Sequence, residues 1–431
     1  MGSAAPQLQP ATPPDWRRRS LPCVALLALL LRLGVILFTG TYHYPAGQDH
    51  FRFGFESGSI ARSVAAGEGF ASPFTGSTGP TAWIAPAYPY LCAVVFKMLG
   101  AFSDASAIAL LALNGVFAAL TCFPVYELGR RTFSSSVGWW SALLWSAAPH
   151  FMKWSTELVW ETSLSALLVM LALLMTLRLA EAPSLRRWLL YGVLWGAIAL
   201  TNPVLVTLLP IALPWIWRRA SPRSELLRNM VLSMLLAGAM FAPWLARNRI
   251  VFGQWVFLRS NFGFELHLGN YHGSFGMGWG GMHPSRNRAQ WERYRQLGEM
   301  KFVEEHRRAA MEFIREYPGE FVSLCGTRFL AFWDGASLTY AYDTAPWTPL
   351  QFAFLSVLAA GGLLLALVRR RPGAGLLVWI VLYPAPYYIT YPQARYRHPV
   401  EPVMLLLAAF FASVVAARVQ SWITHSRRRS A

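Results

Sequence analysis

The first candidate for chemistry is a polar stretch, residues 42–100, that directly follows an apolar run. It holds two carboxylates, Asp49 and Glu56, together with several glycines and prolines and a cluster of aromatic residues. The two acids are seven positions apart, so they share a face if they share a helix. A carboxylate beside a reacting hydroxyl or amine can accept its proton. We therefore interpret the stretch as an outward-facing active site with Glu56 or Asp49 as catalytic base; the alternative is that both acids are solvated or pair with nearby arginines.

A second charged group is spaced by four residues. Lys153, Glu157 and Glu161 form one stripe if the segment is helical. Glu157 and Glu161 place like charges at neighbouring positions, and Glu161 stands at the mouth of an apolar run, where a carboxylate is costly. A bound substrate would account for both features, so we predict substrate contacts here. A solvated helix face is the equal alternative.

Cations gather just before the last apolar run, at Arg395, Arg397 and His398. Positive charge on the outer side of a membrane runs against the positive-inside bias and asks for an explanation. Guanidinium groups bind phosphate oxygens in a bidentate manner. We predict phosphate binding by these residues, with Arg259 as a weaker candidate; anchoring to lipid headgroups is the alternative.

A glycine-rich segment contributes His267, Asn270 and His272, which could touch a sugar or a metal. Metal ligation is the lesser alternative, because no tight His/Asp pattern is present and the four cysteines form no Cys-x-x-Cys pair. No cofactor is predicted, although a divalent metal stays open. Aromatic residues at the ends of apolar runs, such as Trp160, mostly form an interfacial belt, and a few, such as Tyr88, are candidates to contact a sugar ring.

The elements that must position these residues are membrane helices. The chain of 431 residues is 55% hydrophobic and 14% charged, which excludes an ordinary soluble domain. The net charge of +17 is concentrated in short arginine clusters at the ends of apolar runs, a pattern typical of cytoplasmic loops and not of a nucleic-acid patch. We predict an all-α polytopic membrane protein with about ten spans.

The predicted spans are residues 21–38, 106–127, 136–151, 162–179, 188–201, 204–217, 229–246, 347–368, 375–391 and 399–418. Residues 84–100 are also apolar, but a surface or re-entrant helix there leaves every arginine cluster on the cytoplasmic side. The predicted organisation is a disordered cytoplasmic tail (1–16), a transmembrane core (17–246) with its first outer loop (41–104), an extracytoplasmic region (247–346), C-terminal transmembrane helices (347–418) and a basic cytoplasmic tail (419–431). Within the extracytoplasmic region, residues 286–317 read as one helix and 319–333 as an amphipathic surface helix.

Loose motifs in a fixed order resemble a known family. The outer loop with acids ends in Pro-Ala-Tyr-Pro, and the turn that follows reads Tyr-x-x-Gly-Arg-Arg (126–131). Pro-Trp-x-x-Arg-Asn (243–248) precedes the extracytoplasmic region, and Arg-Tyr-Arg-x-Pro (395–399) precedes the last span. Over residues 20–418 this resembles the GT-C glycosyltransferases, in the branch of protein O-mannosyltransferases, aminoarabinose transferases of lipid A and lipopolysaccharide sugar transferases.

The resemblance implies a GT-C-like bundle that moves a sugar, with inversion, from a polyprenyl-phosphate donor to a lipid, glycan or protein acceptor. It implies an integral, multi-pass protein of the cell inner membrane with its active site on the extracytoplasmic face. Glu56 is then preferred over Asp49 as the base, Glu161 matches the family's second acid, and the arginines before the last span match the donor phosphate site. The sequence itself contains no P-loop and no dinucleotide fingerprint, so a soluble nucleotide donor is not expected.

Two other classes of function compete. A transporter or flippase of lipid-linked saccharides would place ionisable groups near mid-span and often shows an internal repeat. Here the acids lie at the outer ends of the apolar runs, and the spans show no strong repeat. An inert assembly protein is the third possibility, and loss of activity from single carboxylate changes would argue against it.

Overall fold

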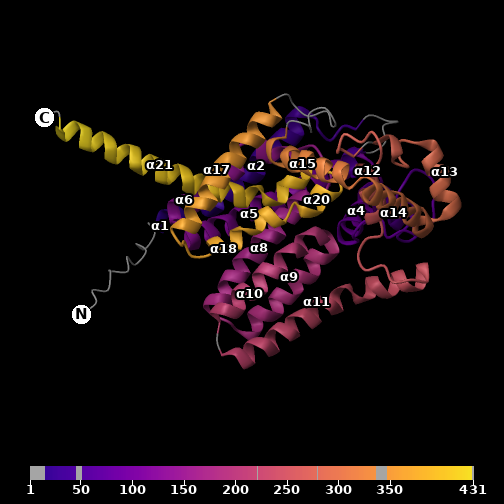
Figure 1. Cartoon of the computed structure of the whole chain (residues 1–431), viewed down its shortest axis with the longest axis horizontal. Helices are drawn as coiled ribbons and strands as arrows, with labels where there is room; N and C mark the ends of the chain where they lie inside the picture. The colour runs from indigo at the N-terminus through magenta and orange to yellow at the C-terminus, as the bar shows by residue number, and fades with distance from the viewer. Residues whose placement is uncertain (1–14, 45–50, 221, 279, 336–346, 430–431) are drawn as a thin grey trace.

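The computed structural model describes residues 15–44, 51–220, 222–278, 280–335 and 347–429 (Figure 1). Most of the predicted tail 1–16 and Asp49 lie outside these residues; Asp15 and Trp16 begin the short helix α1 (Asp15–Arg19). The described residues are mostly helical and form no strand, apart from one isolated bridge between Ala71 and Pro80. The chain is thus an all-α protein, as predicted.

Six helical segments are long and apolar enough to cross a bilayer. They comprise α1 and α2 (Leu21–Thr39), α5 (Asp104–Thr132), α8 (Thr162–Glu181), α11 (Arg223–Phe252), α17 (Thr348–Val368), and η4 (Ala394–Val400) with α21 (Glu401–Arg429). The chain is therefore an integral, multi-pass membrane protein.

The other predicted spans coincide with shorter helical segments. These are α6 (Ser135–Ala147), α9 (Leu185–Thr201), η2 with α10 (Pro203–Leu208, Leu209–Arg219), and a broken run of α18 (Ala374–Leu377), α19 (Trp379–Leu382) and α20 (Ala385–Ile389). Helix α4 (Ala87–Leu99) covers the 84–100 segment with only 13 residues, which is shorter than a crossing requires.

The segments that were predicted to lie outside the membrane form further helices. They are η1 (Phe51–Phe53), α3 (Glu56–Ala65), α7 (Pro149–Thr156), α12 (Phe262–Gly269), η3 (Gly280–Met282), α13 (Arg288–Leu297), α14 (Glu299–Glu316) and α15 (Pro318–Asp334). The single helix predicted for 286–317 is in fact two, because Gly298 takes a φ of 73° and breaks it. The predicted surface helix 319–333 is α15.

Helix α5 is central to the bundle, where it packs against α2, α6 and α8, while α9 packs against α11 and α17 against α21. Figure 1 shows α1 and the end of α21 at one end of the molecule and α12 to α14 at the other. The arginine-rich chain ends therefore lie opposite α12 to α14.

The contact between α5 and α6 depends on two glycines, as is common where membrane helices approach closely. A Cβ atom at Gly138 would lie 2.4 Å from the carbonyl oxygen of Tyr126, and one at Gly129 would lie 2.6 Å from Cα of Gly138. We expect Gly138→Ala to destabilise the protein by about 1–3 kcal/mol, since the backbones must move apart. Thermal unfolding in detergent measures this. Gly238→Ala is the matched control, because a Cβ there meets no atom within 4 Å; an equal effect of both changes would contradict the packing argument.

Candidate active site

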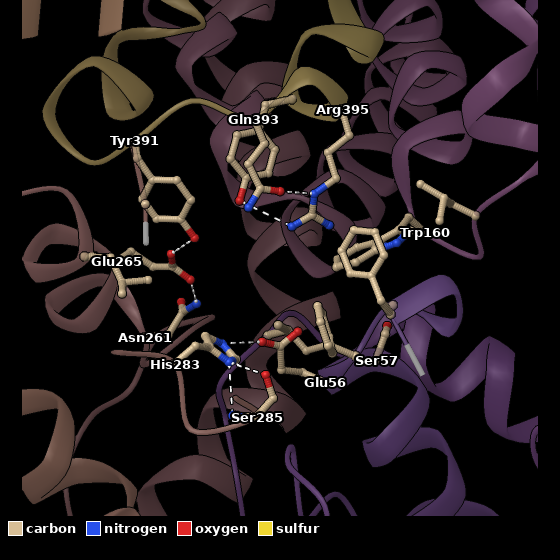
Figure 2. A pocket seen from close by; sticks show the side chains of 18 of the residues that line it. Glu56, Ser57, Trp160, Asn261, Glu265, His283, Ser285, Tyr391, Gln393 and Arg395 are labelled. Atoms are coloured by element: carbon tan, nitrogen blue, oxygen red, sulfur yellow. Dashed lines mark hydrogen bonds and ion pairs between the residues drawn. The ribbon is translucent and has the colours of Figure 1, made fainter. Parts of the chain in front are cut away.

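A cavity of about 1400 Å³ lies at the end of the bundle that carries α12. Its wall is contributed by the first outer loop, the α7–α8 segment, α12 with the glycine-rich loop after it, and the segment from Tyr391 to η4. Figure 2 shows Glu56 and Arg395 on facing sides of this space. The chain therefore brings a carboxylate and a guanidinium from distant parts of the sequence to the wall of one cavity.

Glu56 is the first residue of α3, where the helix dipole favours negative charge. The turn before it is strained: Gly54 has a φ of 76°, and Phe55, with a side chain, has a φ of 43°. A positive φ at a residue with a side chain persists only where the surrounding structure enforces it, and such strained backbone conformations cluster at functional sites. The turn directs the acid into the cavity, and its position immediately before Glu56 makes the carboxylate a strong candidate for chemistry.

His283 holds the Glu56 carboxylate. Its Nε2 atom lies 3.0 Å from Oε1 of Glu56, and its Nδ1 atom lies 2.6 Å from the hydroxyl of Ser285. Burial by itself would raise the pKa of the Glu56 carboxyl, but the hydrogen bond from His283 and the positive charge of Arg395 oppose it and hold that pKa below its usual value. Glu56 is therefore an ionised carboxylate at neutral pH.

Arg395 lies on the opposite wall. Its guanidinium carbon is 3.3 Å from the ring centroid of Trp160, and its Nε donates to the side-chain oxygen of Gln393 at 2.6 Å. Its Nη2 also donates to the hydroxyl of Tyr396 at 3.4 Å. Stacking on the indole face and these two hydrogen bonds fix the plane of the guanidinium and orient it for an anionic ligand. Arg395 is thus oriented as an anion-binding group toward the cavity (Figure 2).

A second carboxylate, Glu265 of α12, faces the cavity near Arg259. Asn261 donates to its Oε1 at 2.6 Å, and the hydroxyl of Tyr391 donates to its Oε2 at 2.5 Å. Burial raises the pKa of the Glu265 carboxyl, although the positive charge of Arg259 and the Tyr391 hydrogen bond oppose the shift. The cavity therefore holds two carboxyl groups whose environments shift their pKa values in opposite directions, as acid–base sites often do.

The structure gathers most of the predicted site residues. Those that line the cavity are Glu56, Tyr88, Lys153, Glu157, Glu161, Arg259 and Arg395. Asp49 lies outside the described residues. The role of each residue in catalysis or binding stays a prediction, and all seven line the same cavity.

Arg397 and His398 do not line the cavity. The guanidinium of Arg397 is buried, lies 4.2 Å from the ring centroid of Phe352 and donates to the carbonyl oxygen of Trp333. His398 contacts Glu401, with Nδ1 2.9 Å from Oε2. The reason is geometric: in a 3₁₀-helix each residue turns the chain by a third of a turn, so neighbours of Arg395 point elsewhere.

His267 and Asn270 are also turned away. Nδ1 of His267 lies 2.7 Å from Nδ1 of His306, and burial lowers the pKa of both imidazoles, that of His306 to about 4. Asn270 donates to the carbonyl oxygens of Leu266 and Ile389, and its own side-chain oxygen accepts from Arg328. These contacts stabilise the glycine-rich loop and leave neither residue on the cavity wall.

Three further residues lie on the cavity wall that were not predicted as site residues. His283 precedes a proline in an irregular segment, and nothing in its neighbours marks it. Glu265 is the single acid of the apolar stretch 262–269, a signal that could have been used. Trp160, interpreted as part of the interfacial belt, instead stacks on Arg395.

Comparison with known proteins agrees with this architecture. Residues 83–246 match the family model described as dolichyl-phosphate-mannose-protein mannosyltransferase. The oligosaccharyltransferase AglB from Archaeoglobus fulgidus, in complex with an inhibitory peptide and a dolichol-phosphate, aligns at 17% identity with a TM-score of 0.56. That alignment covers 96% of this chain and 52% of AglB, so the chain spans about half the length of the archaeal enzyme. No curated protein gives a significant sequence match.

Two further structures are similar. The Archaeoglobus fulgidus oligosaccharyltransferase with Zn and sulfate has 14% identity and a TM-score of 0.50, over 94% of this chain and 51% of that one. ArnT from Cupriavidus metallidurans, bound to undecaprenyl phosphate, has 15% identity over 93% of this chain and 78% of that one, with a TM-score of 0.42 that is too low to establish a common fold. The family model and the shared fold with AglB confirm the predicted resemblance to GT-C glycosyltransferases.

Proposed function

We propose, from this GT-C resemblance, that the chain is an inverting glycosyltransferase that moves a sugar from a polyprenyl-phosphate donor to an extracytoplasmic hydroxyl or amine. One observation supports this most directly: an ionised carboxylate, Glu56, and an oriented guanidinium, Arg395, border the same cavity. The reaction needs a base at the acceptor and a cation at the leaving phosphate, and the cavity offers both. The acceptor is a lipid, a glycan or a protein.

In this mechanism Glu56 takes the proton of the acceptor hydroxyl or amine as the acceptor atom bonds to the anomeric carbon. The bond from that carbon to the phosphate oxygen breaks, and its electron pair leaves with the polyprenyl phosphate. Arg395 binds the phosphate, whose negative charge grows as the bond breaks, and Arg259 adds a second positive charge at the wall. Attack from the face opposite the phosphate inverts the anomeric carbon.

The sugar would occupy the space between these groups. Lys153, Glu157 and Glu161 come from the α7–α8 segment of the wall, and Tyr88 comes from α4. Charged and aromatic side chains at fixed positions are what recognition of sugar hydroxyl groups requires. These four residues are the proposed substrate-binding set.

The proposed location is the cell inner membrane, with the cavity on the extracytoplasmic face. Support comes from the arginine clusters at the chain ends, which lie opposite α12 to α14 in Figure 1. Accessible tags at Ser184 and Ser285 test this directly. The proposal requires Ser184 on the cytoplasmic side and Ser285 outside.

A resident metal is not part of the proposal. Among the described residues, no three histidine, cysteine, aspartate or glutamate side chains gather in a way that could hold a metal ion. The Glu56 carboxylate is instead engaged by an imidazole. We expect transfer to be unchanged after removal of divalent cations with EDTA, and a loss that Mn²⁺ or Mg²⁺ restores would contradict this.

Purified protein in detergent tests the proposed reaction. It is mixed with polyprenyl-phosphate sugars carrying a radioactive label and with lipid, glycan or peptide acceptors, and products are separated by chromatography. Transfer of label in the absence of a sealed membrane supports an enzyme and excludes transport as the explanation. Mass spectrometry of glycolipids and glycoproteins from a strain lacking the protein then identifies the missing product.

A further inference from the structure

The contact between Glu56 and His283 extends into a chain of three groups. His283 lies between the carboxylate and Ser285, which approaches the imidazole with both its hydroxyl and its backbone N–H (Figure 2). The backbone N–H of Ser285 can only donate, and it lies 3.3 Å from Nδ1 of His283. Nδ1 is therefore the accepting nitrogen, so the proton of the neutral imidazole is on Nε2, directed at Glu56.

This arrangement distinguishes the two oxygens of Glu56. Oε1 accepts from Nε2 of His283, 3.0 Å away. The carboxylate also receives a backbone hydrogen bond at Glu56 itself, and Figure 2 shows the second oxygen, Oε2, directed to the side of Arg395. One oxygen is thus held in place and the other faces the substrate space.

We propose that His283 is a positioning residue for the transfer reaction: its Nε2–H fixes Oε1 of Glu56, so that Oε2 is presented, ionised, to the proton of the acceptor. The proposal deepens the glycosyltransferase assignment and rests on it for the identity of the reaction. His283 itself gains and loses no proton. The acceptor proton moves to Oε2, the acceptor atom bonds to the anomeric carbon, and the phosphate departs with the electron pair of the broken bond.

The groups around Glu56 determine in which direction its pKa should move when His283 is replaced. The titratable and charged groups that face Glu56 are His283, Arg395 from η4 and Glu265 from α12. Further charged residues on the cavity wall are Arg52, Lys153, Glu157, Glu161, Arg259 and Arg286. Burial raises the pKa of the Glu56 carboxyl, and the His283 hydrogen bond is the first of the contributions that lower it. Without His283 that pKa must rise, so the base becomes protonated at a higher pH and the acidic limb of the pH–rate profile moves upward.

Substitution of His283 by glutamine or by asparagine tests the roles of Nε2 and Nδ1 separately. The side-chain nitrogen of glutamine can occupy the place of Nε2, whereas that of asparagine can reach only the place of Nδ1. H283Q therefore keeps a donor for Glu56, and H283N and H283A do not. H43A is the control, since His43 forms a similar pair with Asp104, 2.7 Å away, on the exposed surface.

The first measurement does not depend on transfer activity. Dicyclohexylcarbodiimide reacts with protonated carboxyl groups, and mass spectrometry of the peptide containing Glu56 gives its labelling as a function of pH. We expect wild type, H43A and H283Q to be labelled only at lower pH, and H283A and H283N to be labelled up to a higher pH. Labelling is followed in the monodisperse, folded fraction of each variant.

The second measurement is the pH–rate profile. We expect kcat of H283A and H283N to fall on the order of 100-fold at neutral pH, because a base out of position loses that much. The acidic limb of their pH–rate profiles should move to higher pH. H283Q should have most of the wild-type kcat and an acidic limb close to that of wild type. Identical labelling curves in all variants, a shift to lower pH, or an H283Q variant as impaired as H283A would overturn the proposal. Altered labelling in a protein that transfers no sugar would instead refute the proposed function and leave the positioning role of His283 standing.

Discussion

Glu56→Gln is expected to abolish sugar transfer while the protein still folds and accumulates in the membrane. Loss of a general base costs roughly 10²- to 10⁴-fold in rate. Glutamine has the shape of glutamate, and its side-chain oxygen can still accept from Nε2 of His283, so the turn before α3 and the cavity wall should persist. Only the ability to take up a proton is removed.

The matched control is Glu68→Gln. Glu68 lies in the same outer loop, just after α3, and is exposed. It should retain the wild-type rate with purified donor and acceptor. Near wild-type turnover of Glu56→Gln would remove Glu56 from the role of base and would direct attention to Glu265 or Asp49.

Arg395→Lys is expected to retain positive charge and still lose most of the activity. Lysine can neither stack as a plane on Trp160 nor donate two parallel hydrogen bonds to a phosphate. Removing a donor that stabilises developing negative charge costs roughly 10²- to 10³-fold in kcat. The measurement is kcat and KM for the lipid-linked donor, together with inhibition by free polyprenyl phosphate, which should become weaker.

Arg397→Lys provides the contrast, since the two arginines are two positions apart and differ in surroundings. Arg397 is buried among Phe352, Trp333 and Glu401 and does not line the cavity. Its replacement should lower thermal stability and yield, with little change in product inhibition for the protein that folds. Weaker inhibition by polyprenyl phosphate in Arg397→Lys and unchanged inhibition in Arg395→Lys would reverse the assignment.

The sequence alone was sufficient for the class of protein and for much of the bundle. Apolar runs of bilayer length and arginine clusters at their ends are local features, because the lipid requires each crossing segment to satisfy its own backbone hydrogen bonds. The same local logic predicted a helix over 319–333, which is α15, and the interruption between the spans 188–201 and 204–217, where α9 ends at Thr201. Helix ends were harder to place: α11 continues to Phe252, past its predicted end at 246, and the helix predicted for 286–317 is interrupted at Gly298.

Residue type and predicted position on the outer side also determined the candidates Glu56, Glu161 and Arg395, which the structure places around one cavity. What only the tertiary structure decided is which side chains face that cavity. The 3₁₀-helix directs Arg395 inward and Arg397 into the bundle, a difference in direction that residue type cannot reveal. His283 reaches Glu56 only because the glycine-rich loop folds back across the first outer loop, and such contacts between distant segments depend on the packing of the whole chain and not on local pattern.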